Sequence, residues 1–434
     1  MASPIPSSAG PEGSSLIPAA AASWDALEAL AAPEPDRIQG PASAQAMLRV
    51  FGSEERAVRV TLYRDHHAWC PYCQKVWLWL EERRIPYRIR KVTMFCYGEK
   101  EAWYKRLVPS GMLPALEIDG RLITESDRIL EALEAAFGPL VRGMREREVL
   151  ELRQLERLLF QAWCQWLCVP GLGERGERQA EEAFDRLAGT MAQALERCSG
   201  PFLLAELSTA DLVFVPYLER MSASLAYFKG YLLRRRHPAI ARWFEGLEQR
   251  PAYLGSQSDF HTHAHDLPPQ MGGCHASGTA EQRSLADRID RGPWPILSPD
   301  MPDPDPETSQ PAPPEAAAMA LARVVRHRQP LLHRYDRGEG AFDQALRTAL
   351  SHLIGSGPSA PPAGTAAALR SLGQRISVPR DMPLHAARRL RQSLEATARL
   401  DPLDPGALPE PLPLSHRRDQ DPRPFLLAGA VPST

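Results

Sequence analysis

The sequence predicts a small α/β domain followed by an all-helical domain, with long extensions at both ends of the chain. One observation behind this prediction is a regular alternation of strand and helix patterns between Val58 and Phe137. Another is a purely helical pattern from about Met144 to Leu254. In addition, the 434 residues include 42 prolines, which crowd the two ends and the stretch after Gly255.

The α/β domain is predicted over residues 57–138, in the order β-α-β-α-β-β-α. Its strands are rich in β-branched and aromatic residues, and Asp119-Gly120 marks a hairpin between the last two. Pro71 stands at the first turn of the first helix, and Gly138-Pro139 closes the last. The strands are residues 58–63, 87–92, 114–118 and 121–123, and the helices are residues 72–84, 99–107 and 126–137.

The rest of the chain divides by composition. Residues 144–254 have apolar side chains at helical spacing and are predicted to form the all-helical domain. The other segments are rich in Pro, Ser, Ala or Gly, apart from a basic, Ala/Leu-rich stretch with helical texture. They are a mostly disordered arm (1–56), a disordered linker (255–314), a small helical appendage (315–400) and a disordered tail (401–434).

Charge and cysteine content exclude several classes of protein. The formal net charge is −2, from 51 basic and 53 acidic residues, which argues against nucleic acid as a partner. Apolar runs fall short of the roughly 18 residues that span a bilayer, so no membrane partner is expected. The 7 cysteines are an odd number in a long chain, which favours reduced thiols over a secreted disulfide framework. Together these features predict a cytoplasmic protein.

The motif that carries chemistry is Cys70-Pro71-Tyr72-Cys73. A helix is predicted to begin at this motif, so its unpaired N–H groups and partial positive charge favour Cys70 as a thiolate. The thiolate is the form that attacks disulfides. Cys73 faces the inner side of the helix, where it either resolves a mixed disulfide on Cys70 or only packs. A zinc site needs a further pair of ligands, and the sequence has no second CxxC, so redox chemistry is favoured.

Residues 58–137 resemble the N-terminal domain of a cytosolic glutathione transferase of the cysteine-containing kind (omega, lambda and dehydroascorbate reductase classes). Cys-Pro-Tyr-Cys is also the dithiol motif of glutaredoxins. The resemblance continues to Leu254, since Ser208 and Asp211 resemble the family's N-capping box. It implies glutathione transferase architecture: an α/β thioredoxin-like N-terminal domain and an all-α C-terminal domain, here with long flexible N- and C-terminal extensions.

The resemblance also implies a set of site residues. Cys70 and Cys73 would be catalytic, and glutathione would be the co-substrate. Leu113 precedes Pro114, where the family has a cis-proline, and would pair its backbone with the cysteinyl part of glutathione. Glu125 and Ser126 open the next helix, whose N-terminus would receive the γ-glutamyl carboxylate.

For several residues the sequence allows two interpretations. His66 and His67 either stabilise the thiolate or are exposed loop histidines. Cys96 is a second redox thiol or an inert apolar residue. The aromatic residues Trp163, Trp166 and Tyr217 line an electrophile pocket or belong to the core. A further tract resembles a metal-binding sequence, but no metal ligand is assigned because the tract falls in the predicted linker. It comprises His261, His263, His265, Cys274 and His275.

The function that these features favour is a glutathione-dependent thiol transferase or reductase acting through the Cys70 thiolate. Its partners would be glutathione and a small electrophile or disulfide, and the resemblance allows a homodimer. The alternative is a non-catalytic binding or scaffold module, because a fold does not fix a function.

Overall fold

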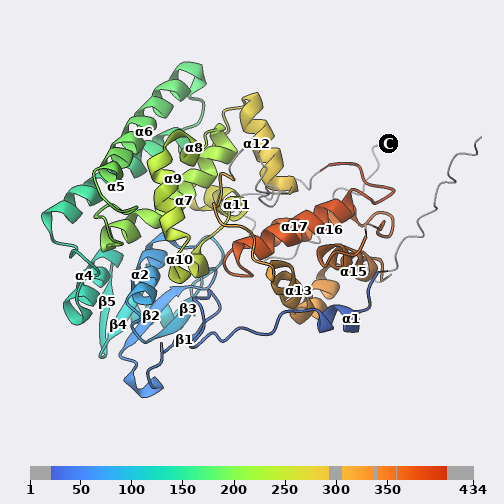
Figure 1. Cartoon of the computed structure of the whole chain (residues 1–434), viewed down its shortest axis with the longest axis horizontal. Coiled ribbons are helices and arrows are strands. Elements are labelled where there is room, and N and C mark those ends of the chain that lie inside the picture. Colours follow the sequence, from blue (N-terminus) through green and yellow to red (C-terminus); the bar gives the residue numbers. More distant parts are fainter. Residues whose placement is uncertain (1–20, 293–304, 336–339, 358, 408–434) are drawn as a thin grey trace, which may run out of the picture.

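The computed structural model describes residues 21–292, 305–335, 340–357 and 359–407. Figure 1 shows a sheet covered by helices at the lower left, long helices above it, and a separate group of helices at the right. One hydrophobic core joins the sheet to the helices that follow it, up to Leu267. A second core lies among the C-terminal helices.

The sheet has the strand order β1-β3-β2-β4-β5. The central strand β2 (Val60–Asp65) runs parallel to β3 (Tyr87–Val92) and antiparallel to β4 (Ala115–Ile118). The hairpin partner of β4 is β5 (Arg121–Thr124), as Asp119-Gly120 predicts. The edge strand β1 (Leu48–Arg49) pairs antiparallel with β3. A strand of 2 residues carries no readable alternation, so sequence patterning gave no sign of it.

Three helices complete the α/β domain. Helix α2 (Pro71–Glu82) follows β2, α3 (Ala102–Leu107) follows β3, and α4 (Ser126–Phe137) follows β5. The apolar side chains of α2 and α4 enter the core beside the sheet, with Trp79 and Leu133 fully buried. The order of elements from β2 to α4 is the predicted β-α-β-α-β-β-α.

An all-helical region follows. The helices are α5 (Arg147–Cys168), α6 (Gly173–Glu196), α7 (Thr209–Lys229), α8 (Leu233–Arg236) and α9 (Pro238–Leu247). Helix α7 is buried on all sides, because α2, α5, α11 and α12 all pack against it. The capping box predicted at Ser208 begins α7: the Asp211 carboxylate accepts hydrogen bonds from the Ser208 backbone N–H at 2.9 Å and hydroxyl at 2.8 Å.

The structure differs from the sequence prediction between residues 255 and 314, where a disordered linker was expected. Helix α10 (Pro251–Ser256) ends there, and α11 (Phe260–Met271) and α12 (Ala280–Arg291) follow. Asp259 and Thr279 cap the latter two helices by accepting a backbone N–H three residues on. Composition misled the prediction because α7 and the C-terminal helices bury this polar, proline-containing stretch. Residues 293–304 lie outside the described part.

The N-terminal arm also contains ordered structure, although the sequence predicts it to be mostly disordered. Residues 1–20 lie outside the described part, and α1 (Trp24–Ala29) and a 3-10 turn (Glu55–Ala57) follow. Leu27 of α1 is fully buried in the C-terminal core. Arg49 is buried against Glu81 of α2 at 2.9 Å. The arm crosses α10 so closely that a Cβ on Gly255 would stand 2.2 Å from the carbonyl oxygen of Ala42.

The C-terminal helices enclose the second core. They are α13 (Ala316–Arg326), α14 (Arg328–Tyr335), α15 (Ala341–Leu353), α16 (Ala366–Arg375) and α17 (Leu384–Ala398). Helix α17 packs against α13, α15 and α16. Most of the predicted disordered tail, residues 408–434, lies outside the described part. The division of the chain into separately folding domains stays a prediction.

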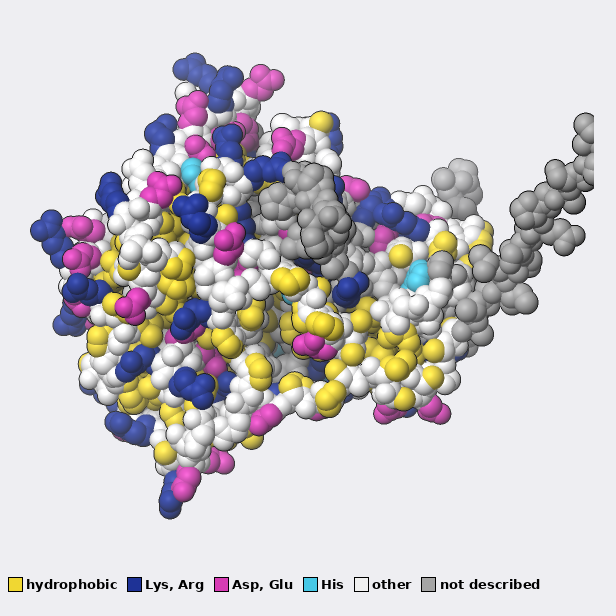
Figure 2. Space-filling model, viewed as in Figure 1, with side chains coloured by type: hydrophobic (Ala, Val, Ile, Leu, Met, Phe, Trp, Pro, Cys, Tyr) yellow, Lys and Arg dark blue, Asp and Glu magenta, His cyan; other side chains and the backbone are white. Residues whose placement is uncertain are grey.

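Charged side chains of both signs are interspersed on the described surface in Figure 2, most visibly over α5 and α6 at the left and top. Within the described ranges, every helix is too short or too polar to cross a membrane.

Candidate functional site

Cys70 lies where the central strand turns into α2. It occupies the N-cap position, with Pro71 as the first residue of the helix. The turn is held by Asp65, whose carboxylate accepts a hydrogen bond from the Trp69 backbone N–H at 2.6 Å. Cys70 thus stands at the positive end of a helix dipole, as the sequence predicts. Only 5 % of its surface is exposed.

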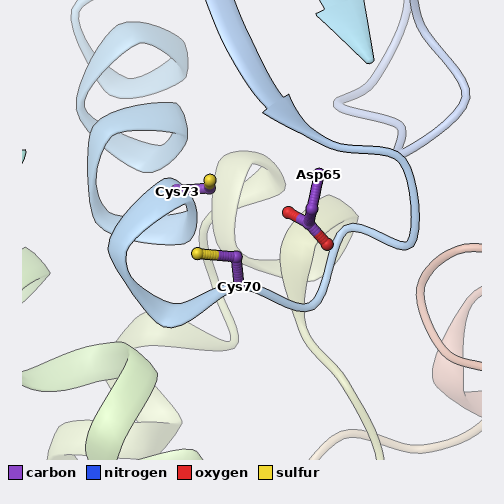
Figure 3. A group of neighbouring side chains, drawn as sticks. All are labelled: Asp65, Cys70 and Cys73. Carbon is purple, nitrogen blue, oxygen red and sulfur yellow. The ribbon is translucent and has the colours of Figure 1, made fainter. Parts of the chain in front are cut away.

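Cys73 and Asp65 complete a buried cluster beside Cys70 (Figure 3). The two sulfur atoms and a carboxylate oxygen of Asp65 all lie within 4.8 Å of one another. Burial raises the pKa of Cys73 well above its usual value, and the neighbouring Cys70 and Asp65 add to the rise. Asp65 Oδ1 is buried without a hydrogen-bond partner. Cys73 therefore stays a neutral thiol near pH 7. The carboxylate beside it has one oxygen that accepts no hydrogen bond.

The sequence analysis did not single out Asp65. The available signal was an acidic residue at the end of a strand that precedes a cysteine motif by a few residues. A carboxylate at a strand end is common, so only its burial beside the thiols reveals its relevance.

Leu113 and Pro114 stand at the same end of the sheet as Cys70. The peptide bond between them is cis, as the resemblance implies. Tyr63 of β2 lies opposite Ala115, the first residue of β4, so the Leu113–Pro114 bond lies beside the end of β2 that leads into the cysteine loop. The hydroxyl of Tyr104 donates to the Met112 carbonyl at 2.6 Å and holds this loop in place.

Glu125 and Ser126 form the corner between β5 and α4. Glu125 adopts a positive φ of 65°, and Ser126 is the buried first residue of the helix. The corner is tied to α2 by Asp127, whose carboxylate lies 2.5 Å from the Nζ of Lys75. Arg153 of α5 binds the other oxygen of Asp127. Although burial opposes it, these two cations lower the pKa of Asp127, which therefore stays ionised.

Arg220 of α7 reaches the cysteine loop from the helical region and was missed by the sequence analysis. Its guanidinium donates to the carbonyl of Trp69, the residue before Cys70, and lies over the Trp69 ring at 4.6 Å. It also donates to Gln74 Oε1 at 3.2 Å, and Gln74 donates to Glu219 at 2.7 Å. An adjacent Glu–Arg pair inside an otherwise apolar helix was the signal that could have identified this contact.

His263 supports the same loop from α11. Its Nδ1 accepts a hydrogen bond from the Trp69 indole at 3.1 Å, and its Nε2 lies 3.8 Å from the Glu219 carboxylate. Burial lowers the pKa of His263, so the ring is neutral and can act as this acceptor. The cysteine loop is thus braced by three elements, namely the end of β2, α7 and α11.

The two loop histidines are not simply exposed. His67 is buried, and its ring stacks on Tyr97 with centroids 3.7 Å apart. His66 is half-buried and lies 3.9 Å from His67, centroid to centroid. For Cys96, burial, with Asp266 and Asp65 adding to it, raises the pKa to about 12. That value favours the inert interpretation of this thiol.

The three aromatic residues considered for an electrophile pocket differ in what they contact. Trp163 and Trp166 are core residues whose indoles donate to Ser224 at 2.9 Å and Glu177 at 2.8 Å. Tyr217 lies edge-on to Tyr72 of the cysteine motif, with ring centroids 6.2 Å apart. Tyr217 is itself buried in the core, but its ring contacts the exposed Tyr72, so it lies directly beneath the surface next to the motif.

Comparison with protein families identifies both regions. Residues 69–136 match the family model "Glutathione S-transferase, N-terminal domain". Residues 170–246 match "Glutathione S-transferase, C-terminal domain". These matches confirm the predicted resemblance and the predicted order of an α/β domain and a helical domain.

Curated relatives cover the same part of the chain. One is "Glutathione S-transferase DHAR3, chloroplastic" of Arabidopsis thaliana, 26% identical over 193 residues, which are 44% of this chain and 69% of the relative. Another is "Glutathione S-transferase L1" of the same plant, 26% identical over 194 residues, or 44% of this chain and 79% of the relative.

Among solved structures, glutathione transferase Omega 3C from Trametes versicolor is 24% identical with a TM-score of 0.40 and covers 46% of this chain and 90% of its own. The dehydroascorbate reductase of Chlamydomonas reinhardtii is 21% identical with a TM-score of 0.38, and the match covers 45% of this chain and 91% of that protein's chain.

Proposed function

Because residues 69–136 and 170–246 match the models of the N-terminal and C-terminal domains of glutathione S-transferases, we propose that this chain is a glutathione-dependent thiol transferase or reductase whose nucleophile is Cys70. The observation that carries the proposal is the position of Cys70 at the N-cap of α2. A helix N-terminus stabilises a thiolate there, and curated relatives bear the names of glutathione transferases.

Glutathione would lie along the wall that faces Cys70. The backbone of Leu113, before cis-Pro114, would pair with the cysteinyl part of glutathione. The N-terminus of α4 at Glu125 and Ser126 would receive the γ-glutamyl carboxylate. The Lys75–Asp127 pair supports this placement because it fixes the start of α4 against α2.

The reaction begins with attack on a disulfide between glutathione and a substrate thiol. The Cys70 thiolate forms a bond to the glutathione sulfur, the substrate–glutathione disulfide bond breaks, and the substrate leaves as a thiolate that takes a proton from water. A second glutathione thiolate then attacks the glutathione sulfur of the mixed disulfide. This step releases oxidised glutathione and restores the Cys70 thiolate.

Cys73 offers a second route out of the mixed disulfide. Its sulfur attacks that of Cys70, glutathione leaves as a thiolate, and a Cys70–Cys73 disulfide forms. The Cys73 proton passes to Asp65, the buried carboxylate beside it. Two further glutathione molecules then reduce the disulfide and become oxidised glutathione. Asp65 acts as a proton acceptor only on this route, because the first route never ionises Cys73.

A panel of thiol-transfer, dehydroascorbate and aromatic-halide assays tests the proposal on the wild type, Cys70→Ser and Cys73→Ser. We expect Cys70→Ser to reduce disulfide and dehydroascorbate turnover to background. Cys73→Ser should retain thiol transfer through the first route. Full disulfide reduction by the Cys70→Ser variant would show that the thiolate mechanism is wrong.

A second candidate is a non-catalytic scaffold, which the low exposure of Cys70 favours. Such a module would not be retained on immobilised glutathione, and its Cys70 would resist iodoacetamide near neutral pH. An enzyme would be retained, and its Cys70 would be alkylated.

For partners and location we keep the expectations from the sequence. The substrate would be a small electrophile or disulfide, the compartment would be the reducing cytoplasm, and a homodimer is the oligomer to look for. Sedimentation of the purified chain at several concentrations tests the last point.

A further inference from the structure

Two histidines and a carboxylate meet between α11 and α12, in the stretch that the sequence predicts to be a linker. His261 and His265 lie on α11, and Asp290 lies near the end of α12. A ring nitrogen of each histidine and an oxygen of Asp290 all lie within 4.8 Å of one another. The Nε2 of His265 stands 2.7 Å from Asp290 Oδ1.

The helical spacing explains why the two rings meet. Residues four apart share one face of a helix, and the ring centroids of His261 and His265 are 4.5 Å apart. His263, between them, points instead to the cysteine loop, where it binds Trp69. Helix α11 thus presents two imidazoles to α12 and one imidazole, that of His263, to the cysteine loop.

Asp290 is itself held in place from a third element. The hydroxyl of Tyr227, on α7, donates to Asp290 Oδ2 at 2.8 Å. The carbonyl of Tyr227 accepts a hydrogen bond from Gln282 at the start of α12, also at 2.8 Å. One carboxylate oxygen therefore faces the histidines while the other is engaged by a donor. This arrangement is typical of metal-binding carboxylates, because a carboxylate that ligates a metal usually also accepts a hydrogen bond from a neighbouring group.

The cluster lies between the interior and the surface. His261 is buried, whereas the side chains of His265 and Asp290 are 27% and 13% exposed. An ion can therefore reach the cluster from water on the side of His265.

A second histidine–aspartate–tyrosine group in the same chain contains a single imidazole. His237 Nε2 lies 3.1 Å from Asp185 Oδ1, and Tyr231 donates to the same oxygen at 2.7 Å. This group offers only one histidine and one carboxylate, and it is not among the sets of three possible metal ligands found in the described residues. A hydrogen-bonded triad needs one imidazole only, so the second imidazole distinguishes the cluster on α11.

We propose that His261, His265 and Asp290 bind a divalent transition-metal ion, with zinc as the ion of choice, and so clamp α12 to α11. Two imidazole nitrogens and one carboxylate oxygen suit zinc, and slight side-chain rotations would bring them to ligand distances of about 2.0–2.2 Å. Three protein ligands leave a fourth position for water. Because α11 also carries His263, the ion would stabilise the helix that braces the Trp69–Cys70 loop.

The test uses the full-length, reduced chain after removal of metal by chelator dialysis. Titration with zinc chloride should give one bound equivalent at this site and raise the melting temperature, because a ligand of the folded state stabilises it. Cobalt(II) as a spectroscopic probe should give visible bands without sulfur-to-cobalt charge transfer, since no thiolate is a ligand. His265→Ala and His261→Ala should lose this binding. Tyr227→Phe should weaken it about 10- to 100-fold.

His237→Ala is the matched control, because it removes a histidine from the other triad and should leave metal uptake unchanged. Asp290→Asn keeps the shape of the side chain and serves if an alanine variant fails to fold. The Cys70→Ser/Cys73→Ser double variant should retain the site. The proposal is overturned if the wild type takes up no zinc or cobalt. It is equally overturned if uptake disappears in the double cysteine variant but survives in His265→Ala.

Discussion

Cys73 and Asp65 show how burial assigns different roles to two thiols of one motif. Cys70 occupies the helix N-cap, whereas Cys73 is 1% exposed and lies beside a buried carboxylate. Burial, the Cys70 thiol and the Asp65 charge together raise the pKa of Cys73. Beside Cys70, the proposed nucleophile, Cys73 is therefore a protonated thiol at neutral pH, and it reacts only when an acceptor takes its proton.

Asp65→Asn should separate two effects of this carboxylate. Without the negative charge, the pKa of Cys73 falls toward its usual value, so alkylation of Cys73 in a Cys70→Ser background should begin at lower pH. The same substitution removes the proton acceptor, so closure of the Cys70–Cys73 disulfide near pH 7 should slow. Mass-spectrometric alkylation profiles and stopped-flow closure rates measure the two effects. An unchanged alkylation profile would show that Asp65 does not influence Cys73.

At the scale of elements, α7 connects the helical region to the cysteine loop. Arg220 is fully buried and donates to the carbonyl of Trp69. Burial lowers the pKa of Arg220, but a guanidinium ordinarily titrates far above neutrality and the adjacent Glu219 opposes the shift, so Arg220 stays charged at neutral pH. The loop between β2 and α2 is therefore fixed partly by a residue from another part of the chain.

Arg220→Met should misplace Cys70 while preserving the volume of the side chain. We expect a loss of about 10- to 100-fold in kcat/KM and in the rate of Cys70 alkylation, with partial rescue by Arg220→Lys. Arg234→Met is the control, since Arg234 is a similarly buried arginine that pairs with Glu248 at 2.7 Å. If both variants slow alkylation equally, the effect of Arg220 is general destabilisation and not positioning.

At the scale of the whole molecule, buried ion pairs join the C-terminal helices to α11. Arg391 of α17 pairs with Asp259, the N-cap of α11. Arg388 of the same helix binds Asp305 and Glu307, and Glu307 in turn accepts a hydrogen bond from the Phe260 backbone N–H at the start of α11. The backbone N–H of Val378 adds a hydrogen bond to Thr262 at 3.0 Å. Helix α11 thus lies between the C-terminal core and the cysteine loop.

Arg391→Leu should leave the Asp259 carboxylate buried without its cation. Removing one partner of a buried pair costs about 3–5 kcal/mol, so the unfolding transition should shift to clearly lower urea concentration. Arg399→Ala is the control, because Arg399 is mostly exposed and pairs with Glu395 one turn away. That loss should cost only about 0.3–0.5 kcal/mol. Equal shifts for the two variants would contradict a structural role for the Arg391–Asp259 pair.

The sequence predicted correctly the features that depend on residues close together in the chain, and it missed those that depend on contacts between distant residues. Local signals predicted β2 to α4, the hairpin at Asp119 and the capping box at Ser208, because each depends on neighbours in the chain. Long-range packing determined what was missed. Arg220 lies far along the chain from Trp69, and α11 looks like a linker until α7 and α17 bury it.

The candidate site was also predictable only in part. The sequence itself contains the cysteine motif, and the resemblance to a known family implied the cis bond before Pro114. It could not predict that Asp65 is buried beside the thiols or that His263 braces the loop. Both facts depend on how distant segments fill the space behind Cys70.

A peptide-mapped mass spectrum tests most directly whether Cys70 is the thiol that accepts glutathione. The full-length Cys73→Ser variant is incubated with oxidised glutathione at neutral pH and then digested without reductant. We predict one glutathionyl group on Cys70, which added glutathione removes. A folded protein whose Cys70 stays unmodified, or takes up glutathione only after unfolding, would contradict the proposed role of Cys70.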